Sequence, residues 1–489
     1  MKRDVALLLL LFAVAIAIVD PRGNMPLDDD WDFAVATWHF ARTGHFAFTP
    51  FTATSLYAQV VWGAAWTRMF GASFFVLRCS TLFLAALTLI AFYGLAAPLD
   101  RAARFLAAAA LLFHPIFFWS SFTYMTHVPF VFCSVVAIYC FTHGRPVPGS
   151  LAVVASFFIR QTGIVTVIPA IILARGRREK MIAAAPLAVF ALALPLLQHG
   201  EFGFHARPGE APFHGALYLF DHFSLAALFV LPVLLPALGA LRNRKVVIGA
   251  MAFFIARALL FVGFANPAWN PILTSTHLFG NVLINFGLGP PTLFDTHRLG
   301  YFYPLHLGYG ARLILTIVSA AAGGALVALL IEQRRLEITY LQVVFASAIL
   351  AVSQLWFDRY TLDATWPLCF FLPLIARNAR ITAIALIVVA AFDVFAVHDY
   401  MQWNRDRNRA WQSLVANGVS PMDINGGVEL NAMERDPFER PRPQWVIRND
   451  YILAFNRIDG YDVVQQFGRV YALRRRRSTK WPPITSNWR

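Results

Sequence analysis

Residues 2–33 of the chain read KRDVALLLLLFAVAIAIVDPRGNMPLDDDWDF, and this stretch decides how the rest is interpreted. An apolar run at 5–19 follows two basic residues, as expected of a helix that enters a membrane. Three successive aspartates, Asp28 to Asp30, stand shortly after that run. Neighbouring carboxylates repel one another, so a cluster of this kind just outside a membrane helix indicates a use for negative charge.

The composition is that of a polytopic membrane protein. Of the 489 residues, 58% are hydrophobic and 14% charged, and the mean hydropathy is +0.57. Soluble proteins carry about a quarter charged residues. The net charge of +14 could suit nucleic acid, but the basic residues are distributed among the loops between apolar segments, which excludes that class. The four cysteines all lie in apolar stretches, without metal or disulfide spacing: Cys79, Cys133, Cys140 and Cys369.

Apolar segments predict a mainly α-helical transmembrane bundle of about eleven full spans. The predicted spans are 5–19, 74–97, 105–119, 127–142, 181–197, 223–240, 246–264, 309–331, 338–356, 361–376 and 381–397. Between them, 151–159 and 164–173 are each too short to span and are separated by Arg160-Gln161-Thr162-Gly163. We interpret this segment as a broken hairpin that enters and leaves on one side, because polar backbone at membrane depth needs protein or water around it.

Basic residues predict the orientation. One set of connections holds most of them, including 175–180 and 242–245, whereas the alternate connections hold few. The N-terminus is therefore expected in the cytoplasm, with the acidic loop at 20–72 and the tail at 398–489 outside it. A signal peptide ending near Ala17 is the alternative, and it would leave the acidic loop on the same side.

The outer connections are long and aromatic. Residues 20–72 contain four tryptophans, 198–222 carry His199, His205, His214 and His222, and 265–308 include Asn281 and Asn285. The chemistry is therefore expected on the outer face. Transporters more often place polar residues near the midplane and show two related halves, and no such repeat is visible.

The first outer loop resembles a family. Asp29-Asp30-Trp31-Asp32-Phe33, followed by a helical stretch that stops at Gly44, is similar to the Asp-Glu-x-x-Tyr motif of integral-membrane glycosyltransferases of the GT-C class. That class includes protein O-mannosyltransferases and the lipid A aminoarabinose transferase, which use polyprenyl-phosphate sugar donors. The resemblance implies that Asp29 is the catalytic base. Asp28 and Asp30 would assist it electrostatically or bind a divalent ion. The plainer interpretation, a solvated acidic helix start that the helix dipole favours, would hold for Asp28 or Asp32.

Further stretches resemble the same family. Thr126-His127-Val128-Pro129 looks like the second outer loop, usually Thr-Asp/Glu-x-Pro, with His127 in place of the acid. This departure puts a metal bridged by two carboxylates in doubt, although His127 would serve as a ligand, as an acid or base, or as a structural group. Arg160 lies where the family has a basic break in its short-helix hairpin. A guanidinium suits a phosphodiester, and the alternative is a structural ion pair.

The last segments are less specific. Asp358-Arg359-Tyr360 resembles a segment at the outer membrane face of related bacterial proteins, where it would contact lipid phosphate or anchor the helix. Arg257 and Arg78 are weaker candidates for the same role. The tail at 398–489 resembles the small C-terminal domain of uncharacterised bacterial members. It is expected to form an α/β domain from a helix at 400–417 and strands at 445–455 and 461–473, and its basic run at 474–477 suits anionic lipid or glycan.

Together these features predict a GT-C-like transmembrane domain at 1–397 and an extracytoplasmic domain at 398–489 in a bacterial inner membrane. The expected reaction is inverting transfer of a sugar from polyprenyl phosphate to an acceptor hydroxyl, with Asp29 as base and Arg160, Arg359 and Arg257 on the donor phosphate. A flippase or a glycan polymerase is the alternative. No metal is expected to be obligatory, although Mg²⁺ or Mn²⁺ would suit the carboxylates. The sugar and the glycan, lipid or protein acceptor stay open.

Overall fold

The structure is a computed structural model, and it divides the chain into two compact units. It describes residues 2–193, 197, 211–264, 282–284, 287–297, 299, 301, 303–333, 338–351, 357–376, 378–433, 437–438 and 448–476. Unit 1 comprises Met1–Pro290 and Leu307–Met401, and unit 2 comprises Pro291–His306 and Gln402–Arg489. Each unit is considered by itself.

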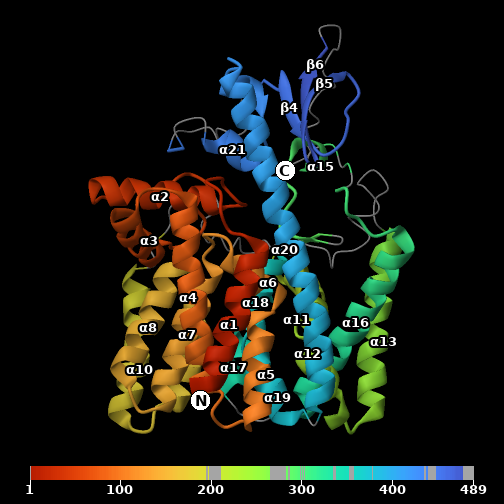
Figure 1. Cartoon of the computed structure of the whole chain (residues 1–489). Coiled ribbons are helices and arrows are strands. Elements are labelled where there is room, and N and C mark those ends of the chain that lie inside the picture. The colour runs from red at the N-terminus through yellow and green to blue at the C-terminus, as the bar shows by residue number, and fades with distance from the viewer. Residues whose placement is uncertain are drawn as a thin grey trace. The chain divides into compact units, whose positions relative to one another are not determined.

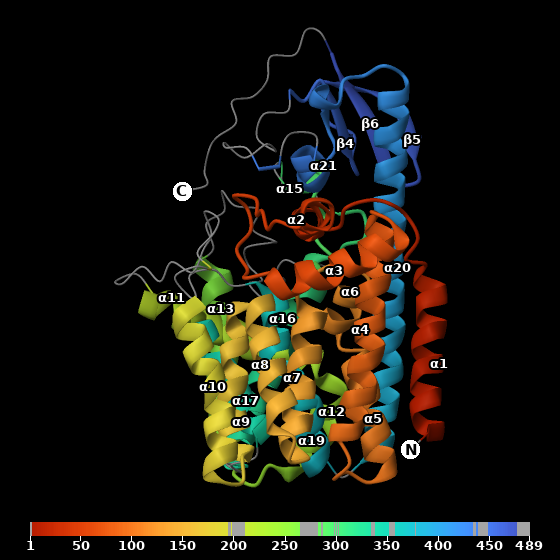
Figure 2. The same cartoon turned by 90° about the vertical axis from the view of Figure 1, so that its left-hand side faces the viewer.

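Unit 1 is a helical bundle with two helices laid across one end. Figures 1 and 2 show α2 (Asp30–Thr43) and α3 (Tyr57–Phe70) crosswise at the end opposite the start of α1 (Lys2–Val19). The other helices of unit 1 are α4 (Phe74–Leu95), α5 (Arg101–Leu112), α6 (Pro115–Ser121), α7 (His127–Thr142), α8 (Pro146–Ile159), α9 (Val167–Leu173), α10 (Arg177–Ala193), α11 (Ala211–Phe229), α12 (Leu231–Ala237), α13 (Arg244–Phe264), α16 (Tyr309–Glu332), α17 (Ile338–Ala351) and α19 (Leu368–Ile375). Helix α20 (Ala379–Ala416) begins in unit 1, and its residues after Met401 belong to unit 2.

The described helices only partly match the predicted spans. Three of them are long and apolar enough to cross a membrane, or up to five if each of two bent pairs counts as one span. The pair α5 and α6 bends by 60°, and the pair formed by α11 and α12 bends by 89°. The number of spans therefore stays a prediction.

The segment predicted as a single span at 361–376 is divided in the structure, and whether it crosses the membrane stays a prediction. The structure has a 3-10 turn, η4 (Asp358–Thr361), followed by α18 (Leu362–Thr365) and α19. Pro367 lies at the break between the two helices, and proline cannot donate the backbone hydrogen bond that would continue α18.

The predicted broken hairpin is present. Helix α8 ends at the extended Arg160, a 3-10 segment η1 (Gln161–Thr166) follows, and α9 returns. Arg175 after α9 donates to the carbonyl of Thr142 at the end of α7, at 3.3 Å, so both ends of the hairpin lie at one level. Gly163 permits the tight reversal, because a Cβ there would lie 2.4 Å from the backbone nitrogen of Phe157.

Unit 2 contains a small mixed sheet with helices. Strands β3 (Ile424–Asn425), β4 (Tyr451–Ala454), β6 (Val470–Arg475) and β5 (Tyr461–Phe467) lie in that order, with β3 and β4 parallel and the other pairs antiparallel. Helix α15 (Phe294–His297) contributes Phe294 to the apolar core, which also holds Ile452 and Leu473. The remaining elements of unit 2 are η5 (Pro421–Asp423) and α21 (Val428–Met433).

Unit 1 also contains two short elements besides its helices. The 3-10 turn η3 (Leu238–Ala240) follows α12, and strand β1 (Leu283–Ile284) pairs with β2 (Gly287–Leu288).

Two predictions for the tail need correction. The strand predicted at 461–473 is two strands, because the chain reverses at Gly468, whose φ of 50° is left-handed. The helix predicted at 400–417 is continuous with the predicted span at 381–397, and both belong to the 38-residue helix α20. Of the strand predicted at 445–455, residues 445–447 lie outside the described part of the chain, and the structure shows β4 within the rest.

Candidate functional site

The conformation of the acidic loop directs the carboxylates of Asp28 and Asp29 away from the start of α2. Asp28 has a φ of 54°, a left-handed conformation that aspartate tolerates better than most residues. Asp29 occupies the N-cap position of α2, but its side chain makes no capping hydrogen bond. The carboxylate of Asp29 is therefore directed away from the backbone N–H groups of the helix start.

Arg78 holds the loop that leads to these aspartates. This arginine of α4 is fully buried and donates to the carbonyl oxygens of Gly23, at 2.7 Å, and of Met25. Arg78, a weaker candidate for binding lipid phosphate, thus supports the backbone of the acidic loop in the structure.

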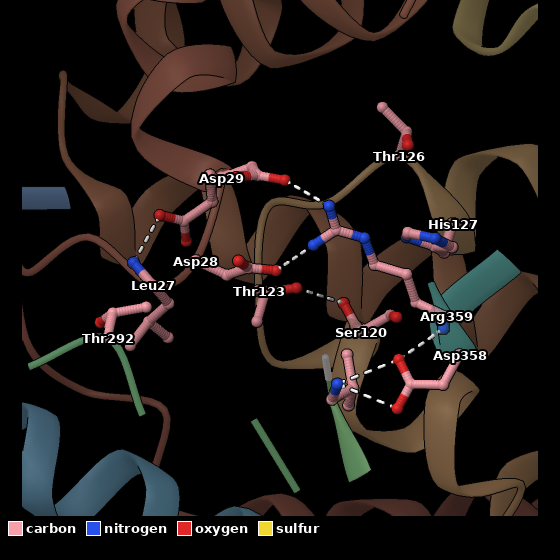
Figure 3. Close-up of polar contacts among 12 residues, drawn as sticks. Leu27, Asp28, Asp29, Ser120, Thr123, Thr126, His127, Thr292, Asp358 and Arg359 are labelled. Atoms are coloured by element: carbon pink, nitrogen blue, oxygen red, sulfur yellow. Dashed lines mark hydrogen bonds and ion pairs between the residues drawn. The ribbon is translucent and has the colours of Figure 1, made fainter. Parts of the chain in front are cut away.

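Arg359 brings Asp28 and Asp29 together from 330 residues away. Its Nη1 pairs with Asp28, and its Nη2 donates to Oδ2 of Asp29 at 2.6 Å (Figure 3). The side chains of Asp28 and Arg359 are buried, whereas that of Asp29 is 22% exposed. Burial opposes the charge of Arg359, but Asp28 and Asp29 outweigh it and raise the pKa of the guanidinium above its ordinary value.

Asp358 fixes the backbone from which Arg359 projects. Its carboxylate is fully buried and accepts hydrogen bonds from the backbone N–H groups of Val282, at 2.9 Å, and Leu283, at 2.6 Å. It also accepts from the N–H of Arg359 at 2.8 Å (Figure 3). Burial raises the pKa of Asp358, and these hydrogen bonds act against that rise. Asp358 therefore anchors a loop onto η4 and holds the position of Arg359.

A second buried arginine comes from the hairpin break. Nη1 of Arg160 donates to Nε2 of His127 at 2.8 Å and to Oγ1 of Thr126 at 3.3 Å. Its Nη2 lies 3.7 Å from a carboxylate oxygen of Asp363. The guanidinium carbons of Arg160 and Arg359 lie 5.2 and 5.9 Å from the ring centroid of Tyr360, so this ring contacts both arginines. The predicted phosphate-binding residues Arg160 and Arg359 are thus brought together, with His127 beside them.

The other carboxylates of the acidic loop have different partners. Asp30 is fully buried and accepts from the N–H of Leu27 at 2.6 Å and of Tyr124 at 3.5 Å, so it joins the first loop to the second. Asp32 accepts from the hydroxyl groups of Thr49 and Thr52, at 2.5 and 2.8 Å. Burial raises the pKa of Asp32 to about 7, those hydroxyl groups oppose the rise, and the charge of Asp29 adds to it.

Some predicted residues lie elsewhere. Arg257 is placed against α11, 6.0 Å from the ring centroid of Phe220 and near Asp221. His222 lies within hydrogen-bond distance of Ser347, at 3.2 Å. His199, His205, Asn281, Asn285 and the side chain of His214 lie outside the described residues.

Two residues of the site were not singled out in the sequence. Asp363 follows Arg359 by one helical turn in a segment predicted to span, and an acidic residue in such a segment is by itself a signal of function or pairing. Tyr360 was quoted only as part of a motif, although its ring lies against both arginines.

The side chains that could hold a divalent metal ion have other partners in the structure. Arg359 pairs with both Asp28 and Asp29, and the lone pair of His127 Nε2 accepts from Arg160. A cation placed among these ligands would lie beside two guanidinium charges. Within the described parts of the chain, no group of three or more His, Cys, Asp or Glu residues is arranged to hold a metal.

The chain was compared with known proteins in three ways. No protein-family model matches it, and no curated protein matches its sequence. Among solved structures, ArnT from Cupriavidus metallidurans in the apo state is 11% identical with a TM-score of 0.39, over 85% of this chain and 81% of that one. ArnT from the same organism bound to undecaprenyl phosphate is 12% identical with a TM-score of 0.40, over 98% of this chain and 99% of that one. A likeness at these values establishes neither activity nor substrate.

Proposed function

We propose that the chain is a membrane glycosyltransferase that moves a sugar from a polyprenyl-phosphate donor to an acceptor hydroxyl. The observation that carries this proposal is the contact of 2.6 Å between Asp29 and Arg359. It joins a partly exposed carboxylate, suited to accept a proton, to a buried guanidinium, suited to hold a phosphate. The family resemblance of the acidic loop points to the same pairing of roles.

Asp29 is the proposed general base. It takes the proton of the acceptor hydroxyl as that oxygen bonds to the anomeric carbon of the sugar. The bond between the anomeric carbon and the phosphate oxygen breaks on the opposite side, and the electron pair leaves with the lipid phosphate. The configuration is therefore inverted.

Arg359 and Arg160 stabilise the charge that develops on the leaving phosphate. The N–H groups of Arg359 that contact the two carboxylates can also bind a phosphate. When the lipid-phosphate donor binds, its phosphate competes with Asp29 for Arg359, so the ion pair weakens and the Asp29 carboxylate becomes available as a base. Asp28 then keeps Arg359 in place. Asp30 and Asp358 act as positioning residues, because their oxygens bond to the backbones of the loops.

A flippase or a glycan polymerase is the second candidate. A flippase needs charges along its translocation path, and the bundle holds the buried Asp221 on α11 within electrostatic reach of the half-buried Arg257 on α13. Neither function needs a carboxylate poised beside an arginine at the start of α2, so we favour transfer.

Transfer is tested with purified protein in proteoliposomes, using a radiolabelled sugar on polyprenyl phosphate and an envelope fraction as the source of acceptors. We expect label to move from the lipid donor and not from a nucleotide sugar. Asp29→Asn should abolish transfer while the protein stays folded. Full activity of a folded Asp29→Asn protein would contradict the assignment of Asp29 as the base.

We also propose that the site faces outward from a bacterial inner membrane, with the N-terminus in the cytoplasm and residues 398–489 outside. The distribution of basic residues supports this orientation. A phosphatase fused after Arg489 should be active, and activity of a cytoplasmic reporter at that position would contradict it.

A further inference from the structure

The hydrogen bond from Arg160 fixes the protonation of His127. A guanidinium has only N–H donors, so the contact of 2.8 Å between Arg160 Nη1 and His127 Nε2 requires a lone pair on Nε2. A protonated ring would also lie beside two guanidinium charges, those of Arg160 and Arg359. His127 is therefore a neutral imidazole whose single proton is on Nδ1.

That Nδ1–H is a buried donor. His127 is 1% exposed, and its Nδ1 has no hydrogen-bond partner among the residues that the structure describes. The same holds for Nε of Arg160 and Oγ of Ser120. Buried polar groups are almost always satisfied, so each such group needs an explanation.

The unsatisfied donors of His127 and Arg160 lie close together, because Arg160 is hydrogen-bonded to the ring directly. Figure 3 shows the His127 ring beside the side chain of Arg359. N–H donors next to two guanidiniums match an anion with several acceptor oxygens, and a phosphate is the anion that the proposed reaction supplies.

We propose that His127 is a phosphate-binding residue that donates through Nδ1–H to the head group of the lipid donor. Arg160 fixes the tautomer, and Arg359 supplies the second cation. This inference rests on the proposed function and adds a residue to it: where the resembling family has an acid in its second loop, this chain has a hydrogen-bond donor. Two arginines and an imidazole N–H then hold the phosphate in the absence of a divalent cation.

The test measures the affinity of the purified protein in nanodiscs for undecaprenyl phosphate, which carries no sugar, so binding is separated from transfer. His127→Gln keeps an acceptor near the position of Nε2 and removes the donor near Nδ1. We expect it to weaken binding by about tenfold or more, the loss of one hydrogen bond to a charged group. His127→Asn keeps an amide N–H near the position of Nδ1 and should lose less.

His114 provides a matched control. It is fully buried, and its Nε2 lies within hydrogen-bond distance of the Thr365 hydroxyl, at 2.8 Å. Its Nδ1, like that of His127, has no partner among the described residues. His114→Gln should therefore change lipid-phosphate affinity far less than His127→Gln. If His127→Gln does not fold, the ¹⁵N shifts of His127 in the wild type decide: Nδ1 should carry the proton and shift when the lipid is added.

The inference is overturned by wild-type affinity in a folded His127→Gln protein, by a proton on Nε2, or by wild-type binding that EDTA abolishes and Mg²⁺ or Mn²⁺ restores. A wild type that does not bind the lipid phosphate at all would instead overturn the proposed function.

Discussion

Two arginine–carboxylate clusters in this chain have nearly the same contact distances and opposite characters. In unit 2, Arg407 pairs with Glu429 at 2.7 Å, and Thr292 donates to the same carboxylate at 2.7 Å. In unit 1, Arg359 pairs with Asp29 at 2.6 Å and also with Asp28. The contact distance alone therefore does not distinguish a structural pair from a functional one.

Burial makes the distinction. The side chains of Arg407 and Glu429 are both at most 1% exposed. In the cluster of Arg359, one guanidinium contacts two carboxylates, and the side chain of Asp29 is 22% exposed. This cluster also lies near the buried unsatisfied donor of His127. A closed pair stabilises one conformation, whereas a partly open cluster with competing partners can exchange one of them for a ligand.

The largest effect is expected from breaking the closed pair. Arg407→Met leaves the Glu429 carboxylate buried without its cation, which should cost about 3–5 kcal/mol in the free energy of unfolding. The measurement is the melting temperature of the purified protein, together with protease sensitivity of residues 402–476. The double variant Arg407→Met/Glu429→Leu should recover much of the loss, because both charges are removed together. A single variant as stable as the wild type would show that the pair is not structural.

The open cluster should respond in activity rather than in stability. Arg359→Lys keeps a positive charge but loses the planar pair of donors, so transfer should fall by about 10²–10³-fold with a small change in melting temperature. Initial rates at several donor concentrations measure it. A variant that loses stability as strongly as Arg407→Met would make Arg359 a structural residue as well and break the comparison.

A smaller effect concerns Asp32, which lies about one helical turn from Asp29 and accepts hydrogen bonds from the hydroxyl groups of Thr49 and Thr52. Burial raises its pKa to about 7, so the folded state binds its proton more tightly than the unfolded state. Its contribution to stability is present at low pH and is lost as pH rises from about 4 to about 7. Asp32→Asn should match the wild type near pH 4 and become more stable than it as pH rises, by about 1–3 kcal/mol at pH 8, as measured by melting temperature. Parallel pH profiles of the two proteins would contradict this.

Much of the architecture follows from the sequence, because apolar length and basic residues report directly on helices and their ends. The hairpin at 150–173 was predicted from two short apolar runs around Arg160, and the structure contains it. Helix continuity was harder. Pro367 breaks a predicted span, and α20 continues past the place where its hydropathy falls, because composition does not report where a helix stops.

The site was predicted residue by residue but not as an arrangement. Asp29, Arg160, His127 and Arg359 were each chosen by type and resemblance, and the structure gathers them at one end of unit 1. The partners of the neighbouring residues were not predictable. Asp30 accepts a hydrogen bond from the backbone N–H of Leu27, and Arg78 donates to backbone carbonyl groups, and both contacts depend on the loop conformation. Such contacts join segments far apart in the chain, and one sequence carries no record of them.

The most direct test measures binding and transfer on the same Asp29→Asn protein. Removing this carboxylate takes away the base and also a competitor for Arg359. The account predicts that the variant binds undecaprenyl phosphate at least as tightly as the wild type, while transfer falls by about 10²–10⁴-fold, the contribution of a general base. If binding and transfer fall together, or if neither changes, Asp29 is not the base of a phosphate-binding site.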